Sequence, residues 1–197
     1  IDRFNELTIS TNKILYFQKE NMISSNKFSK FTFKNEYFAE SASFQYFISQ
    51  PKITSNKEMK VYDLKNNIFY IKNFEYEMKK NLFRGSNTKF IDEEKNEYLI
   101  SNTVINLNNN NISGKDLSIN FNKSTFGNNE NDPRLKSRSF YLTENLSSMD
   151  KGVFTTCKKN DQCPPWTISA ENITHDKKKE TIAYKNAWLK LYDIPVA

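Results

Sequence analysis

Glycine is scarce in this sequence, with only four among 197 residues. Tight β-hairpins need residues with positive φ, which are normally glycine. A hairpin-rich chain of this composition must therefore use another residue in its turns. Asparagine tolerates the left-handed region better than other non-glycine residues, so we expect it to occupy these positions.

The residues that build common active sites are also scarce. The chain has one histidine, His175, and no G-x-S-x-G motif or glycine-rich phosphate loop. Two cysteines and one histidine supply too few ligands for a zinc site, and the Asp92-Glu93-Glu94 cluster is typical of an acidic turn. We therefore expect no enzyme, no metal site and no cofactor.

Long apolar runs are missing as well. No stretch approaches the roughly 18 apolar residues that a membrane helix needs, and Ile68–Ile71 is typical of the runs present. No signal peptide precedes Ile1, so we expect a mature or excised part of a longer protein. The formal net charge of +6 is compatible with an anionic partner, although scattered lysines favour solvated turns. Aromatic residues are not interleaved with basic ones, which argues against nucleic-acid binding.

Aromatic residues, in contrast, are abundant. They make up 14% of a chain whose hydrophobic fraction is only 37%. A disordered segment would contain far fewer aromatic residues. The combination favours an all-β protein whose sheet buries one face and exposes the other.

Apolar residues repeat along the chain with an unusual spacing. They alternate, skip two residues and then alternate again, as in Ile112, Gly114, Leu117, Ile119 and Phe121. The second position of each unit falls at 11, 39, 71, 85, 100, 114, 170 and 184, with separations close to multiples of about 14. The repeat predicts strands of roughly ten residues joined by short turns. Weaker units are expected near Ile23–Phe28 and Ile53–Val61, with others within 122–165.

The double skip predicts a bend at the same level in every strand. Two consecutive outward residues reverse the parity of a strand, as a β-bulge does. A sheet creased in this way brings its two halves face to face across an apolar interior. Polar turns at 63–67, 79–81, 93–96, 108–111 and 177–180 favour antiparallel neighbours. The sequence therefore predicts a bent antiparallel β-jelly roll that is V-shaped and open, in one domain over 1–197; a parallel β-helix is the alternative.

The rhythm loosens over 122–165, and we expect 131–165 to be an irregular segment that contains both cysteines. Cys157 and Cys163 are spaced for a local disulfide across an exposed turn, which would indicate an oxidising compartment. Free thiols, or partners outside this chain, are the alternatives.

The C-terminal third resembles the N-terminal periplasmic domain of the LptD (OstA) family of lipopolysaccharide-assembly proteins. The resemblance rests on Cys163-Pro164-Pro165-Trp166-Thr167-Ile168-Ser169-Ala170, on Tyr184-Lys185-Asn186-Ala187 and on Asp193-Ile194-Pro195-Val196. Asn131-Asp132-Pro133-Arg134-Leu135 resembles a further family element. The specific motifs cover about 131–197, and earlier residues match only as general OstA-type strand repeats.

This resemblance implies a non-enzymatic lipopolysaccharide conduit at the periplasmic face of the outer membrane of a Gram-negative cell. The implied partners are lipopolysaccharide, an LptA-like bridge protein, a C-terminal β-barrel that this chain lacks, and an LptE-like lipoprotein. We expect the bridge to pair with an edge strand around Ile9–Phe17. The resemblance also allows one or both cysteines to form disulfides with the barrel.

The parity of the repeat selects the residues that would line a lipid groove, each of which is equally compatible with ordinary core packing. They are Ile71, Phe74, Tyr76, Phe90, Ile100, Ile105, Leu117, Ile119, Ile168, Ile173 and Leu189. Two other functions stay open: a free-standing transport protein of the LptA or LptC type, and a structural or adhesive β-solenoid without lipid cargo.

Overall fold

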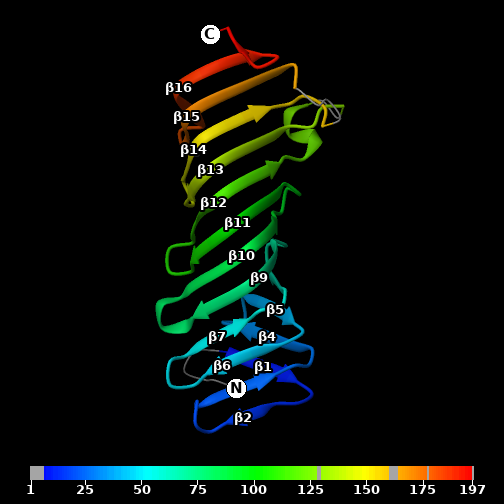
Figure 1. Ribbon diagram of the computed structural model, residues 1–197, viewed down its shortest axis with the longest axis vertical. Coiled ribbons are helices and arrows are strands. Elements are labelled where there is room, and N and C mark those ends of the chain that lie inside the picture. Colours follow the sequence, from blue (N-terminus) through cyan, green and yellow to red (C-terminus); the bar gives the residue numbers. More distant parts are fainter. Residues whose placement is uncertain (1–6, 128–129, 160–163, 177, 197) are drawn as a thin grey trace.

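The computed structural model describes residues 7–127, 130–159, 164–176 and 178–196. These residues form 17 strands of one open sheet, and every pairing between strands is antiparallel. The strands stack along the long axis, from the N-terminal end at the bottom of Figure 1 to the C-terminal end at the top. The predicted all-β, bent antiparallel architecture is confirmed.

The first eight strands are short and form two layers. One layer contains β1 (Leu7–Thr11), β4 (Ser29–Phe33), β5 (Tyr37–Ser41) and β8 (Met59–Asp63), paired in that order. The other contains β2 (Leu15–Phe17), β3 (Met22–Ser25), β6 (Phe44–Phe47) and β7 (Lys52–Ser55). We call these layers A and B.

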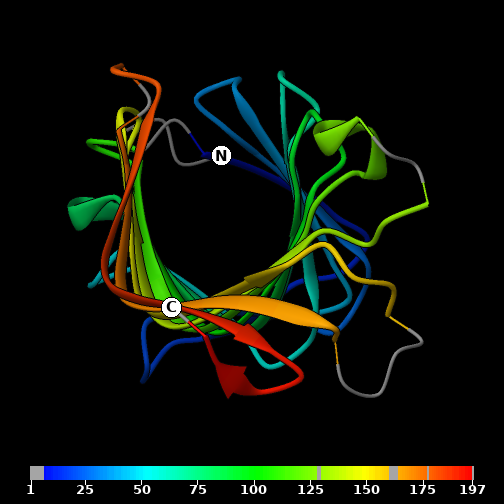
Figure 2. The same cartoon turned by 90° about the horizontal axis from the view of Figure 1, so that it is seen from above.

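Both layers meet on one long strand, β9 (Ile68–Glu77). β8 pairs with its first half, where Met59 lies opposite Ile71, and β7 pairs with its second half, where Ser55 lies opposite Phe74. Layers A and B are therefore two halves of one creased sheet, and Figure 2 shows the strands curving around the long axis.

From β9 onward each strand crosses the crease without a break. The long strands follow one another in antiparallel pairs up to the C-terminal end. They are β10 (Leu82–Ile91), β11 (Glu97–Asn106), β12 (Asn111–Asn120), β13 (Arg134–Leu142), β14 (Leu146–Thr155), β15 (Trp166–Asp176) and β16 (Thr181–Leu191), followed by the two-residue β17 (Ile194–Pro195). Two 3-10 turns, η1 (Met78–Lys80) and η2 (Lys123–Phe126), complete the secondary structure of the described residues.

The predicted change of parity occurs at the crease. In β9, Lys72 and Asn73 both point outward, while Ile71 and Phe74 on either side are each only 2% exposed. The same arrangement recurs in β12, where Lys115 and Asp116 are exposed and Leu117 is buried. β9 and β12 therefore turn apolar residues inward on both sides of the bend.

The hydrogen-bond ladder differs from the expected bulge. Between β11 and β12, Ile100 pairs with Leu117 and Asn102 pairs with Lys115, so the pairing register is the same on both sides of the crease. Both strands carry the extra outward residue at the same point along the crease. Ser101 and Asp116 therefore lie opposite each other there but are not paired in the β11–β12 ladder. Among the described pairings, a register shift accompanies the crease only between β9 and β10.

Asparagine does occupy positive-φ positions, as expected. It does so in the turns at Asn21, Asn35, Asn66, Asn81 and Asn110. It also does so at the crease, at Asn73, Asn87 and Asn186, where Asp116 and Lys151 adopt the same conformation. Of the four glycines, only Gly127 has a positive φ among the described residues.

The segment 131–165 is more regular than we expected. β13 and β14 fill most of it, and they pair with each other and with the neighbouring strands of the sheet. The 14-residue rhythm is weaker there because the loop from Asn122 to Pro133 lengthens one turn and polar Ser137 takes an inward position.

The interior contains two apolar clusters. The first lies between layers A and B and against β9, around Phe44, Phe74 and Tyr76. The second lies within the bend of β11–β15, around Ile100, Leu117 and Ile173. Between them, the hydroxyls of Thr88 and Thr103 are buried and have no hydrogen-bond partner in the part of the chain that the structure describes.

Candidate functional site

An apolar cavity of about 660 Å³ lies between layer A and the long strands β9–β12. Layer B contributes Ile53 to its wall. The apolar lining residues are Leu7, Phe31, Phe33, Tyr37, Ala39, Ile53, Met59, Val61, Phe69, Ile71, Phe74, Tyr76, Phe83, Phe90, Ile105, Leu107 and Ile112, joined by Leu64 at the mouth. This volume lies in the range of small-molecule binding sites.

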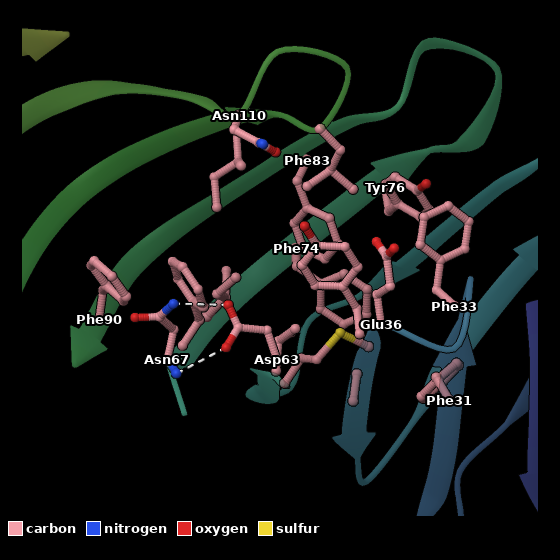
Figure 3. A pocket seen from close by; sticks show the side chains of 18 of the residues that line it. Phe31, Phe33, Glu36, Asp63, Asn67, Phe74, Tyr76, Phe83, Phe90 and Asn110 are labelled. Carbon is pink, nitrogen blue, oxygen red and sulfur yellow. Dashed lines mark hydrogen bonds between the residues drawn. The ribbon is translucent and has the colours of Figure 1, made fainter. Parts of the chain in front are cut away.

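Aromatic rings form much of the wall, and Figure 3 shows them converging on the cavity. The rings of Phe33 and Tyr76 meet edge to face with their centroids 5.3 Å apart, and those of Tyr76 and Phe83 stack at 5.2 Å. Phe69 and Phe90 stack at 4.3 Å further along the wall. Such pairs fix the ring positions by packing, so the cavity is largely preformed.

The mouth of the cavity lies between the turns at the two free margins of the bent sheet. One margin contributes Glu36 and the turn from Asp63 to Asn67, and the other contributes Asn110 and Glu144. The first turn is held by Asp63, whose carboxylate accepts hydrogen bonds from the Asn67 backbone N–H at 3.0 Å and side-chain amide at 2.8 Å (Figure 3). A rigid polar turn therefore borders an apolar interior.

The tyrosine side chains at the site are shielded from solvent. Burial raises the pKa of Tyr76 well above its usual range, and its hydroxyl donates a hydrogen bond to Asn81 at 3.1 Å. Burial, assisted by the charges of Glu36 and Asp63, also raises the pKa of Tyr37. Both tyrosines stay neutral at physiological pH and act as amphipathic wall residues.

The structure brings five of the eleven predicted groove residues to the cavity: Ile71, Phe74, Tyr76, Phe90 and Ile105. Four others, Ile100, Leu117, Ile119 and Ile173, belong to the second apolar cluster instead. Ile168 is half-buried in β15, and Leu189 on β16 is 38% exposed.

Sequence reasoning missed the contribution of the N-terminal strands to the cavity. Phe31, Phe33, Met59 and Val61 were available as a signal, because they alternate as the stronger units do. The polar mouth had no such signal, since its residues come from turns far apart in the sequence.

Cys157 does not line the cavity. Cys157 is a free, half-buried cysteine whose Sγ lies 3.7 Å from the Trp166 carbonyl oxygen. Cys163 lies outside the described residues, so its pairing with Cys157 stays a prediction.

The described ranges contain no group of three or more His, Cys, Asp and Glu side chains placed to hold a metal ion. Within the same ranges, no helix has the length and apolar character needed to cross a membrane.

Comparison with known proteins leaves the geometry as the main guide to function. No protein-family model matches the chain, and no curated protein matches it at a significant level.

Proposed function

We propose that this chain is a non-enzymatic lipid conduit that carries the acyl chains of lipopolysaccharide through its apolar interior. The observation that carries the proposal is the cavity of about 660 Å³ between layer A and strands β9–β12, whose wall consists mainly of aromatic and aliphatic side chains. The family resemblance of the C-terminal third supports lipopolysaccharide as the cargo.

The cavity supplies a physical reason for binding without chemistry. Removing apolar surface from water yields about 25 cal/mol per Å², or about 0.8 kcal/mol for each buried methylene. An acyl chain inside the cavity gains this free energy, while sugars and phosphates stay in water at the mouth. No covalent step is needed, and the lack of a catalytic motif fits this role.

The ends of the sheet suggest how the conduit joins its partners. In the described part of the chain, β2 pairs only with β3, and its Leu15 and Tyr16 are 46% and 59% exposed. An unpaired, apolar edge favours strand addition by another sheet. We infer that an LptA-like bridge pairs with the edge formed by β1 and β2.

The opposite end also exposes apolar residues. β16 carries Ile182, Trp188 and Leu191, which are 54%, 54% and 45% exposed. By the same resemblance, this end passes the lipid to an outer-membrane barrel and its LptE-like lipoprotein, at the periplasmic face of the outer membrane. The local edge chemistry fits a β-rich partner there.

The alternatives differ in what they require of the interior. An adhesive or structural β-solenoid needs no cavity, so the cavity favours the conduit. A free-standing transport protein of the LptA or LptC type would use the same cavity, and the C-terminal motifs are what favour the barrel-linked form.

Photocrosslinking tests the proposal directly. A p-benzoylphenylalanine at position 90 enlarges a half-buried ring at the cavity wall, whereas one at exposed Lys72 points away from it. In cells that make lipopolysaccharide, we expect an adduct at position 90 and little at position 72. Equal yields of adduct at both positions, or no adduct at position 90 in a folded variant, would contradict the proposal.

A further inference from the structure

The charges at the cavity mouth are unbalanced. Among the residues lining the cavity, Glu36, Asp63 and Glu144 carry carboxylates and Lys65 carries the single ammonium, a formal charge of −2 (1 − 3) at pH 7. The protein as a whole is positive, at +6. The mouth therefore has the opposite sign to the molecule.

The carboxylates come from both margins of the opening. Glu36 follows β4 and Asp63 ends β8 on layer A, while Glu144 lies in the turn between β13 and β14 on the other margin. A headgroup held between the margins thus meets negative charge on both sides. Low dielectric in the apolar wall strengthens such fields relative to bulk water.

Two of these carboxylates act on the inner wall as well. Glu36 is an exposed residue of the turn between β4 and β5 that borders the cavity. Burial is the main cause of the raised pKa of Tyr37, and the charges of Glu36 and Asp63 raise it further. The basic neighbour Lys34 stacks its ammonium 5.3 Å from the Phe33 ring centroid and does not line the cavity.

We propose that the cavity selects amphiphiles that carry positive charge next to the acyl chain and discriminates against those with a bare anionic headgroup. This inference rests on the proposed function, since it assumes that acyl chains enter the cavity. The preferred cargo is an amine-bearing lipid, or a phosphorylated lipid whose charge is covered by a divalent cation.

Binding of three single-chain probes below their micelle concentrations separates the inference from the proposed function. Dodecyltrimethylammonium, dodecyl maltoside and dodecyl phosphate share the same chain, and their headgroups are cationic, neutral and anionic respectively. At low ionic strength, we expect titration calorimetry to give the cationic probe about tenfold tighter binding than the anionic one. Salt should reduce this ratio because the mouth is exposed.

The variants locate the effect at the mouth. Replacing its three carboxylates with amides (Glu36→Gln, Asp63→Asn, Glu144→Gln) should bring the ratio to within about twofold. Binding of dodecyl maltoside, whose headgroup is neutral, reports any change in the cavity itself. The control variant makes the same change of charge at exposed glutamates that do not line the cavity, and it should keep the ratio. These are Glu20→Gln, Glu58→Gln and Glu93→Gln.

A magnesium arm distinguishes the two sources of positive charge. Mg²⁺ should tighten dodecyl phosphate binding to the unaltered chain but have little effect on its binding to the mouth variant. If Mg²⁺ does not tighten binding to the unaltered chain, amine-bearing lipids alone are the preferred class. If all three probes bind the unaltered chain equally, the selectivity is overturned and the conduit stands. If none binds, the conduit itself fails.

Discussion

At the residue scale, three glycines serve the interior of the bend and not its turns. Gly85, Gly114 and Gly152 lie beside the crease, where inward side chains from adjacent strands crowd together. A Cβ on Gly114 would lie 2.3 Å from the Asn102 carbonyl oxygen and 2.8 Å from the Phe140 ring. The scarcity of glycine therefore reflects its use for close packing, while asparagine takes the turns.

Gly114→Ala should destabilise the protein by about 1–3 kcal/mol, because the added methyl overlaps backbone that cannot easily move. Gly152→Ala should cost less, since its nearest atom, 2.3 Å away, is the flexible Cδ1 of Ile173. Urea denaturation of both variants measures the difference. A smaller loss for Gly114→Ala than for Gly152→Ala would contradict the crowding argument.

Glu77 should make stability depend on pH at the margin of layer B. Its hydrogen bond with Lys80, followed by that with Arg84, lowers the pKa of Glu77 from 4.5 to about 2. A lowered folded-state pKa adds stability that is complete above pH 4.5 and is lost as the pH falls toward 2. Glu77→Gln should therefore be less stable than the unaltered chain at pH 7, with the gap closing by pH 2.

Equilibrium urea midpoints at several pH values measure this gap. Because the group is exposed, the effect is expected to be small, and salt should reduce it. A gap that is independent of pH would show that the ion pairs with Lys80 and Arg84 do not cause it.

At the scale of the element, the crease depends on residues that accept a left-handed backbone inside a strand. Asn87 has a φ of 47° in the middle of β10 and is exposed. Asn186 in β16 and Asp116 in β12 occupy the same level, with φ of 50° and 53°. Asparagine and aspartate tolerate this conformation, and a β-branched residue does not.

Asn87→Val should therefore cost about 1–2 kcal/mol although no buried contact is lost. Lys136→Val is the matched control, because Lys136 is an exposed residue of β13 and is not among the positive-φ residues. We expect the control to change the free energy of unfolding by less than about 0.5 kcal/mol. Equal stability of the two variants would remove the conformational argument.

The long strands were predictable from the sequence, and the short ones only in outline. β9, β10, β11 and β12 coincide with predicted units because their inward residues follow the repeat of alternation, two outward residues and alternation again. The first four units were expected as single bent strands, but each is divided in two.

Buried serines explain the division of the early strands. Ser25, Ser41 and Ser55 lie at the corners and are 4%, 2% and 9% exposed. The hydroxyl of Ser41 donates to the Ser43 carbonyl at 2.9 Å, and that of Ser55 accepts from the Lys57 N–H at 3.0 Å. These local bonds replace ladder bonds and end the strands. The recurring Ser-Asn-Lys at 25–27 and 55–57 is the signal that would have predicted this.

The cavity was predictable only as an apolar interior. Parity identifies inward residues such as Ile105 and Ile173, but it cannot tell which of them border empty space and which pack together. That distinction depends on how far layer A lies from strands β9–β12, a property of the whole creased sheet. The acidic mouth depends on turns such as 63–67 whose apposition the sequence does not encode locally.

At the scale of the molecule, the interior is divided between a cavity and a filled core. The cavity lies among β1–β12, and the second cluster fills the bend of β11–β15 with its own side chains. A chain that leaves the cavity toward β16 must displace this second cluster or run along the open margin. We therefore infer that an acyl chain rests in the N-terminal half of the molecule.

Methyl NMR of the isoleucine side chains during titration with dodecyl maltoside, below its micelle concentration, tests this placement most directly. Ile71 and Ile105 line the cavity, whereas Ile119 and Ile173 belong to the second cluster. We predict saturable shifts at Ile71 and Ile105 and little change at Ile119 and Ile173. Shifts confined to the second cluster, or none at the cavity up to the micelle concentration, would contradict the claim that the cavity holds acyl chains.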